Sequence, residues 1–227
     1  LEDDESPDLL NVLVDPRGGI RQRDGVDRRN TTALSADIKG IWGLHTDSGT
    51  SQVMVNYGTK VAYSASGNFT DVSGITARTA GSRVYGVTMN NVAYGVSYDK
   101  PSFKWTGSSG ADLGTTFGSG GNMPQAQYIA FWNNYAWVAN TYESATNHKS
   151  RIRWSNVNDP ETWAANDYVD IDKGDHGDYI TGLCPMGDRL IVFKTNSVHA
   201  VFGFGSDSFQ VTTLSNDVGS VPLSSPV

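Results

Sequence analysis

Cysteine is nearly absent from this chain. Its 227 residues include one cysteine, Cys184, which excludes an internal disulfide framework and a zinc site built from four cysteines. Cys184 stands between Leu183 and Pro185, and this apolar context predicts a small buried side chain rather than a nucleophile. Long apolar runs are absent as well. No stretch approaches the roughly 18 apolar residues of a membrane helix, so the sequence predicts no membrane span.

Positive charge is scarce. Lys and Arg number 17 against 24 Asp and Glu, which gives a formal net charge of −7. Because affinity for nucleic-acid phosphates comes from Lys and Arg, this balance argues against a groove that grips nucleic acid. It fits a soluble surface, or a wall that nucleic acid passes without sticking.

One basic cluster stands near the start of the chain. Its members are Arg17, Arg21, Arg23, Arg28 and Arg29. They predict an interface with an anionic partner or a neighbouring subunit, and a solvated extended arm is the alternative.

The residues that are abundant favour β-structure. The chain has 25 glycines, ten tyrosines and six tryptophans, while Leu is sparse and Ala falls in no run of helical period. Glycine with aromatic and β-branched residues is typical of many short strands joined by tight turns. With 38% hydrophobic residues, the length suffices for one large all-β domain or two small ones.

A pattern of four strands repeats from Ile38 onward. The predicted strands are 38–42, 52–55, 60–63 and 69–72; then 84–87, 92–96, 103–105 and a weak one near Leu113; then 128–131, 135–138, 151–154 and 168–171; then 180–183, 190–193, 198–202 and 209–214. Asn90-Asn91 and Asn133-Asn134 join the first two strands of their units and tolerate the positive φ of two-residue hairpins.

This repeat predicts an all-β β-propeller of four-stranded antiparallel blades. Aromatic residues of the third strands recur 42 to 49 residues apart, and propeller blades span roughly 40–50 residues. A plain antiparallel sandwich or barrel, with strands every 8–12 residues or so, is the alternative. Residues 143–149 lengthen the third unit and are expected to form a polar rim loop.

The pattern divides the chain into three parts. Residues 1–36 are predicted to be an extended N-terminal arm with a strand, a turn and a second strand between 11 and 25. Residues 37–216 hold about four blades, and 217–227 read as a linker. Because four blades make a small ring, further blades are expected in the intact protein.

The densest acidic segment is 170–178. Asp170, Asp172 and Asp175 alternate closely enough to be candidate ligands of Ca²⁺, which prefers hard oxygen donors. The spacing misses that of an EF-hand loop. The favoured alternative is a turn between blades whose carboxylates accept backbone N–H groups.

No catalytic residue and no cofactor are predicted. Residues 155–163 are similar to the Asp-box turn of sialidase-type propellers, one residue longer and with Pro160 in place of glycine. That turn is structural, and its aromatic residue packs into the blade. A glycosidase needs a pair of carboxylates around the scissile bond, and no such pair stands out. Arg151 and Arg153 alternate on one strand and are expected to pair with acidic neighbours.

Exposed aromatic residues can stack on sugars. The candidate platforms are Trp42, Trp132, Trp137 and Trp163. Packing between blades is the favoured interpretation for most of them.

Two parts of the chain resemble a known family. They are residues 6–12 with 18–25, and residues 153–163 with 175–183 and 187–194, including Asp-Pro-Glu-Thr-Trp and Gly-Asp-Arg-Leu. They resemble the propeller-bearing tail proteins of tailed bacteriophages, of the nozzle or head–tail stabilisation type.

The resemblance implies a non-enzymatic structural protein of the virion tail or head–tail connector. Such proteins form rings of identical subunits, often six, around a channel for double-stranded DNA, and they contact neighbouring tail or connector proteins. The alternative functions are a sugar- or receptor-binding propeller and, less favoured, a sialidase-like glycosidase.

Overall fold

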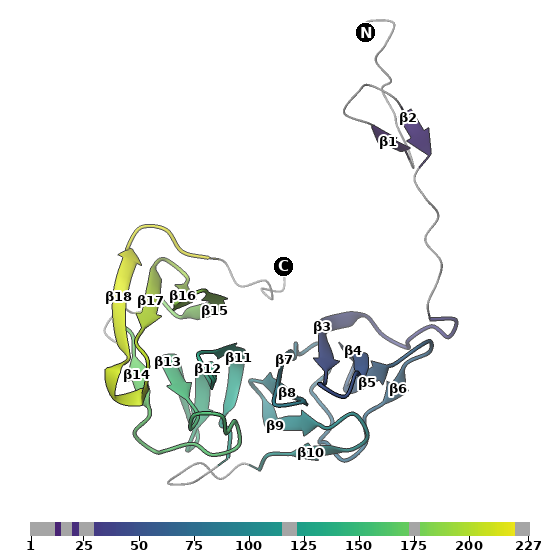
Figure 1. The fold of residues 1–227 in the computed structure, drawn as a ribbon, viewed down its shortest axis with the longest axis horizontal. Coiled ribbons are helices and arrows are strands. Elements are labelled where there is room, and N and C mark those ends of the chain that lie inside the picture. The colour runs from purple at the N-terminus through teal and green to yellow at the C-terminus, as the bar shows by residue number, and fades with distance from the viewer. Residues whose placement is uncertain (1–11, 15–19, 23–29, 115–121, 173–177, 221–227) are drawn as a thin grey trace, which may run out of the picture.

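The computed structural model describes residues 12–14, 20–22, 30–114, 122–172 and 178–220 (Figure 1). These residues form eighteen strands and one short 3₁₀ helix, η1 (Ser206–Ser208). Four antiparallel sheets of four strands each contain all strands except β1 and β2. The chain is therefore all-β, as the sequence predicts. No helix in this described part is long and apolar enough to cross a membrane.

Each four-stranded sheet is one blade built from consecutive strands. The first contains β3 (Ile38–His45), β4 (Ser51–Tyr57), β5 (Lys60–Ser64) and β6 (Thr70–Asp71). The second contains β7 (Tyr85–Met89), β8 (Val92–Ser97), β9 (Lys100–Trp105) and β10 (Gly110–Asp112). The third contains β11 (Gln125–Trp132), β12 (Tyr135–Glu143), β13 (Thr146–Trp154) and β14 (Tyr168–Asp170). The fourth contains β15 (Ile180–Met186), β16 (Arg189–Lys194), β17 (Val198–Phe202) and β18 (Gln210–Ser215).

The blades follow one another along an open arc (Figure 1). Their first strands lie toward the inside of the arc, where β7 contacts β3 and β11, and β11 also contacts β15. The fourth strands lie at the outer edge. This propeller-like arrangement of blades confirms the predicted fold class, and it differs from a sandwich, in which two sheets would face each other across one core.

Tight turns with positive φ join the first two strands of each later blade. Asn90 and Asn91 have φ of 51° and 66°, and Asn133 and Asn134 have 52° and 65°. Gly187 has φ of 55°. At the two asparagine turns both central residues are left-handed, which is the hairpin turn that matches strand twist, and at the Gly187-Asp188 turn only the glycine is left-handed. Asparagine and glycine adopt this conformation at low cost. The turn chemistry therefore fixes the register of the blades as predicted.

Hydrophobic cores lie between consecutive blades rather than within one sheet. The core between the first and second blades contains Leu44, Met54, Val61, Val84, Phe103 and Trp105. The core between the second and third contains Met89, Tyr94, Val96, Leu113, Val138 and Trp163. The core between the third and fourth contains Trp132, Trp137, Ile152, Trp154, Leu190, Val192 and Val201. Each fully buried large side chain contributes about 1.5–3 kcal/mol, so every blade depends on its neighbours.

The prediction of a rim loop at residues 143–149 is wrong. Strands β12 and β13 continue through this segment, and a two-residue turn at Ser144 and Ala145, with φ of 49° and 61°, joins them. The polar side chains stay in the sheet because Glu143, which is 6% exposed, meets two arginines of β13. The insertion therefore lengthens a hairpin instead of forming a loop.

Two further predictions concern single segments. The expected hairpin near the start is present, since β1 (Val12–Val14) pairs antiparallel with β2 (Ile20–Gln22). The expected burial of Cys184 is wrong: the residue is half-buried on β15. It alternates with Leu183, whose side chain packs toward the third blade, so Cys184 lies on the opposite face of the fourth blade.

Candidate functional sites

The basic N-terminal cluster falls largely outside the described residues. Arg17, Arg23, Arg28 and Arg29 lie there, and Arg21 is in β2 with Leu13 as its backbone partner. Its role as an interface stays a prediction.

The acidic segment does not gather its described carboxylates around one point. Asp170 is held by Arg151, whose Nε and Nη2 donate to its two oxygens over 2.7 and 2.9 Å. Asp172 lies 3.5 Å from Nε2 of His199. Asp175 lies outside the described residues. In the ranges that the structure describes, no group of three Asp, Glu, His or Cys residues could hold a metal ion.

Asp178, at the end of the same segment, forms a buried ion pair with Lys194. Both side chains are almost inaccessible, at 2% and 0% exposed, and Nζ lies 3.3 Å from Oδ2. Ser197 Oγ donates to Oδ2 over 2.6 Å, and the backbone N–H of Asn196 donates to Oδ1 over 2.8 Å. Burial alone would raise the pKa of Asp178, but these hydrogen bonds and the ammonium hold it below its usual value. Lys194 Nζ also donates to the carbonyl of Ile171 over 3.1 Å, which links the fourth blade to the third.

A second buried ionic network joins three strands of the third blade. Arg153 donates from Nε and Nη2 to both oxygens of Glu143 over 2.8 and 2.9 Å. Arg151 reaches the same carboxylate over 3.3 Å, and Tyr168 lies under both guanidinium groups, 3.8 and 4.7 Å from ring centroid to Cζ. Burial would raise the pKa of Glu143, but the two arginines and Thr141 lower it. The expected pairing of Arg151 and Arg153 with acidic neighbours is confirmed.

The segment similar to an Asp-box is a structural turn between β13 and β14. Trp163 is fully buried in the core between the second and third blades, and its Nε1 donates to the carbonyl of Pro160 over 2.8 Å. Glu161 accepts from Lys104 of the second blade over 2.7 Å and from Tyr94 Oη over 3.1 Å. The turn therefore connects two blades, and its aromatic residue packs inside as expected.

Turns at one end of the blades are joined by hydrogen bonds from blade to blade. Asn91 Oδ1 accepts from the backbone N–H of Asp47 over 2.7 Å, between the second and first blades. Asn90 Nδ2 donates to the carbonyl of Asn158 over 2.8 Å, between the second and third. Asn133 Nδ2 donates to the carbonyl of Gly203 over 3.2 Å, between the third and fourth. The same kind of contact thus recurs at all three junctions.

The tryptophans are mostly unsuited to stack on a ligand. Trp137 and Trp163 are 0% exposed and Trp132 is 6% exposed, while Trp42 is half-buried and packs against the core between the first two blades. Packing between blades is confirmed for the first three.

Two carboxylates line one cleft near the turns of the third blade. The cleft has a volume of about 380 Å³, and Asp159, Asp167 and Tyr135 are among its lining residues. Burial raises the pKa of Asp167. Asp159 Oδ1 accepts the backbone N–H of Glu161 over 3.1 Å and so holds the turn. One member of the pair therefore already has a structural role.

Comparison with models of known protein families finds no match, and comparison with curated proteins finds none either.

Proposed function

We propose that this chain is a non-enzymatic structural protein of a tailed-phage virion, part of the tail or of the head–tail connector, that assembles into a homo-oligomeric ring. The observation that carries the proposal is the use of polar side chains for blade-to-blade contacts. Asn91, Asn90 and Asn133 link successive turns, and Glu161 and Lys194 link successive blades through charged groups. Such contacts favour a rigid scaffold, since each blade is fixed at its core and at its rim.

The positions of the resembling segments support the same proposal. The Asp-Pro-Glu-Thr-Trp segment, 159–163, lies between β13 and β14 of the third blade. The Gly-Asp-Arg-Leu segment begins at the turn between β15 and β16 of the fourth blade. The resemblance implies consecutive blades for these two segments, and the fold agrees with that expectation.

Exposed apolar residues at the two ends of the arc support assembly. On the first blade, Ile38 and Ile41 are 50% and 71% exposed. On the fourth blade, Met186 and Leu214 are 62% and 52% exposed. Strand alternation places Ile41 on the face turned away from the second blade, because its neighbour Trp42 packs against the core between the first two blades. Met186 is three positions from Leu183, whose side chain packs toward the third blade, so Met186 lies on the opposite face of the fourth blade. Exposed apolar side chains on an open end blade are available for contact with a second subunit.

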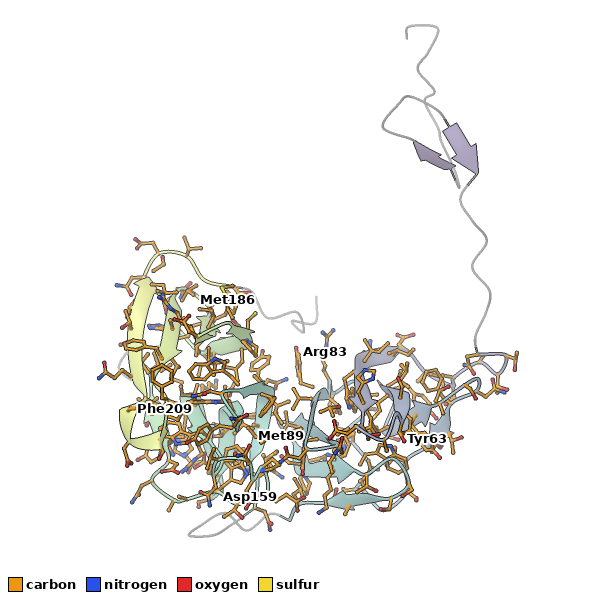
Figure 2. All side chains as sticks on the ribbon, in the orientation of Figure 1. Tyr63, Arg83, Met89, Asp159, Met186 and Phe209 are labelled. Atoms are coloured by element: carbon orange, nitrogen blue, oxygen red, sulfur yellow. The ribbon has the colours of Figure 1, made fainter. Side chains whose placement is uncertain are left out.

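The inner edge of the arc argues against a uniformly acidic channel wall. Lys39 and Arg83 line a cleft of about 270 Å³ at the start of β3 and β7. Arg83 points into the open centre of the arc (Figure 2). Cations at this position attract phosphate, so the proposal rests on scaffolding and not on charge repulsion of DNA.

Oligomeric state tests the ring. The full chain is examined by mass photometry and negative-stain imaging, and a closed ring with an axial hole is expected. Ile41→Asp buries a charge in the proposed interface and is expected to yield monomers with an unchanged circular dichroism spectrum. Val157→Asp is the matched control, because Val157 is 53% exposed on a turn away from the open faces, and it should leave the ring intact.

Monomers of the unmodified chain at tens of micromolar would contradict self-assembly. Mass spectrometry of purified virions of the encoding phage tests the virion assignment separately, and absence of the chain from those particles would overturn it.

A further inference from the structure

A polar and aromatic cleft lies where the second, third and fourth blades meet. Its volume is about 290 Å³, close to the lower end of ligand pockets, which run from about 300 to 1,000 Å³. It lies at the end of the blades opposite to the joined turns, since it includes the turn between β8 and β9 and the start of β13. Its lining residues are Tyr98, Gln127, Asn140, Asn147, Lys149 and Tyr179.

Two half-buried tyrosines form the aromatic part of the cleft. Tyr98 follows β8 in the second blade, and Tyr179 precedes β15 of the fourth. A third ring, Tyr142, lies 6.1 Å from Tyr98 between centroids and is 38% exposed. Half-buried rings held on different blades have fixed positions and one accessible side, which suits stacking against the C–H face of a sugar.

Three amide side chains line the cleft. Asn140 stands at a β-bulge with φ of 55° and is 9% exposed; its Nδ2 donates to the carbonyl of Ile180 over 3.4 Å, while its buried Oδ1 has no partner in the described structure. Asn140 therefore forms a buried part of the cleft wall. The side chains of Gln127 and Asn147 form no hydrogen bond to any described residue, so they are available to hydrogen-bond with the hydroxyl groups of a ligand.

The single charged residue of the lining is a cation. Lys149 is exposed, and its ammonium lies 5.9 Å from the ring centroid of Tyr179. No carboxylate of the described ranges lies within 4 Å of it, although the whole chain carries a net charge of −7. An isolated ammonium beside two aromatic rings and three amides matches a sugar ring that carries a carboxylate.

We propose that this cleft binds a pyranose residue bearing a carboxylate. The site is independent of ring assembly, so either proposal can fail without the other. The buried tryptophans, which the sequence offered as platforms, play no part in it. The half-buried tyrosines take that role.

A matched pair of saccharides tests the proposal. Methyl β-glucuronide and methyl β-glucoside differ only in the carboxylate, and N-acetylneuraminic acid serves as a second acidic probe. Each is titrated into the full chain by ligand-observed NMR and calorimetry. An acidic saccharide is expected to bind about tenfold or more tightly than the glucoside, because a charged hydrogen bond is worth roughly that factor. Absence of binding by both acidic saccharides would overturn the proposal.

Variants assign the binding to this cleft. Lys149→Met should reduce glucuronide affinity to the glucoside level, whereas Lys39→Met on the first blade should change neither. Tyr98→Phe should keep the affinity for both saccharides, and Tyr98→Ala should lower both by about tenfold. Near-ultraviolet circular dichroism checks folding, and Asn147→Ala, at an exposed position, provides a second loss-of-binding variant. A glucuronide preference unchanged in Lys149→Met would place the binding elsewhere and reject this site.

Discussion

The junction of the first two blades and the junction of the last two are closed by different polar groups. At the first, Trp105 Nε1 donates to Gln52 Oε1 over 2.7 Å, and the backbone N–H of Val84 donates to Asn56 Oδ1 over 3.2 Å. At the last, Lys194 and Asp178 form an ion pair. Junctions between blades can therefore be stabilised by neutral hydrogen bonds or by a buried ion pair.

The difference has consequences for stability. A neutral hydrogen bond contributes about 0.5–1.5 kcal/mol net, and losing it leaves a modest penalty. A buried ion pair adds little net stability, but removing one partner leaves an uncompensated buried charge. The buried cation near the first junction, Arg78, donates to the carbonyl of Pro101 over 2.7 Å and stays protonated at any pH that proteins tolerate. Its carboxylate partner Asp112 is 25% exposed, whereas both partners of the ion pair at the last junction are almost inaccessible, so we expect the larger penalty there.

Removing the ammonium of the last junction is expected to have the largest effect. Lys194→Met should lower the free energy of unfolding by about 3–5 kcal/mol at pH 7, since Asp178 keeps its charge in a buried site without a cation. The measurement is urea denaturation followed by tryptophan fluorescence. The double variant Lys194→Met/Asp178→Asn should recover part of the loss, because it removes the unpaired charge.

The matched control for this substitution is Lys39→Met. The Lys39 side chain is 41% exposed and its ion pair with Asp37 spans 3.6 Å, so the change should stay within about 0.5 kcal/mol. Equal losses of unfolding free energy in the two lysine variants would show that the buried ion pair has no special role in stability.

The next largest effect is expected from a substitution that disturbs the close packing between the first two blades. A Cβ added to Gly40 in β3 would lie 2.3 Å from the carbonyl oxygen of Val84, which is backbone and cannot rotate away. Gly40→Ala should therefore separate the inner edges of the first two blades and cost about 1–3 kcal/mol in urea denaturation.

The last junction supplies the control for the glycine. Gly182 lies on β15, the corresponding strand of the fourth blade, and a Cβ there would meet the Phe193 ring at 3.9 Å, an ordinary contact. Gly182→Ala should be nearly neutral. A cost as large as that of Gly40→Ala would mean that backbone preference, and not the approach of two blades, sets the penalty.

Local signals in the sequence predicted the strands and turns. Asn90-Asn91 and Asn133-Asn134 mark two-residue hairpins because few residues accept positive φ, and the alternation of Arg151 with Arg153 indicated a common face. These features depend on neighbours a few positions apart, so a single sequence reveals them.

Contacts between distant segments were not predictable in this way. Lysine is almost never fully buried unless paired, so nothing local marked Lys194 as a core residue. The sequence predicted a polar loop at Glu143, because no local pattern shows that its two arginine partners lie beside it. The cleft brings Tyr98 to Tyr179 from different blades, and no spacing rule links them.

Acid is expected to act on the last junction through His199. This residue is 1% exposed, and burial lowers the pKa of its imidazole below the ordinary 6.5. The nearby carboxylates of Asp172 and Asp178 raise this pKa and the ammonium of Lys194 lowers it, and the net effect is a lowered pKa. Because the folded pKa is depressed, the unfolded chain binds more protons in acid. The stabilising contribution is therefore complete above about pH 6.5 and falls as the pH drops toward the folded value, by at most about 1.4 kcal/mol per pH unit.

Urea denaturation at pH 7.5, 6.5 and 5.5 measures this decline, and His199→Gln should flatten it. Asp178 and Glu143 do not interfere in this window, since their pKa values are lowered and their contributions are lost only at more acidic pH. His45→Gln is the matched control, because His45 is exposed on the first blade, and it should keep the unmodified slope. If the His199→Gln variant kept the full slope of unfolding free energy against pH, the acid sensitivity would not come from His199. The two junctions would then differ only in their response to substitutions.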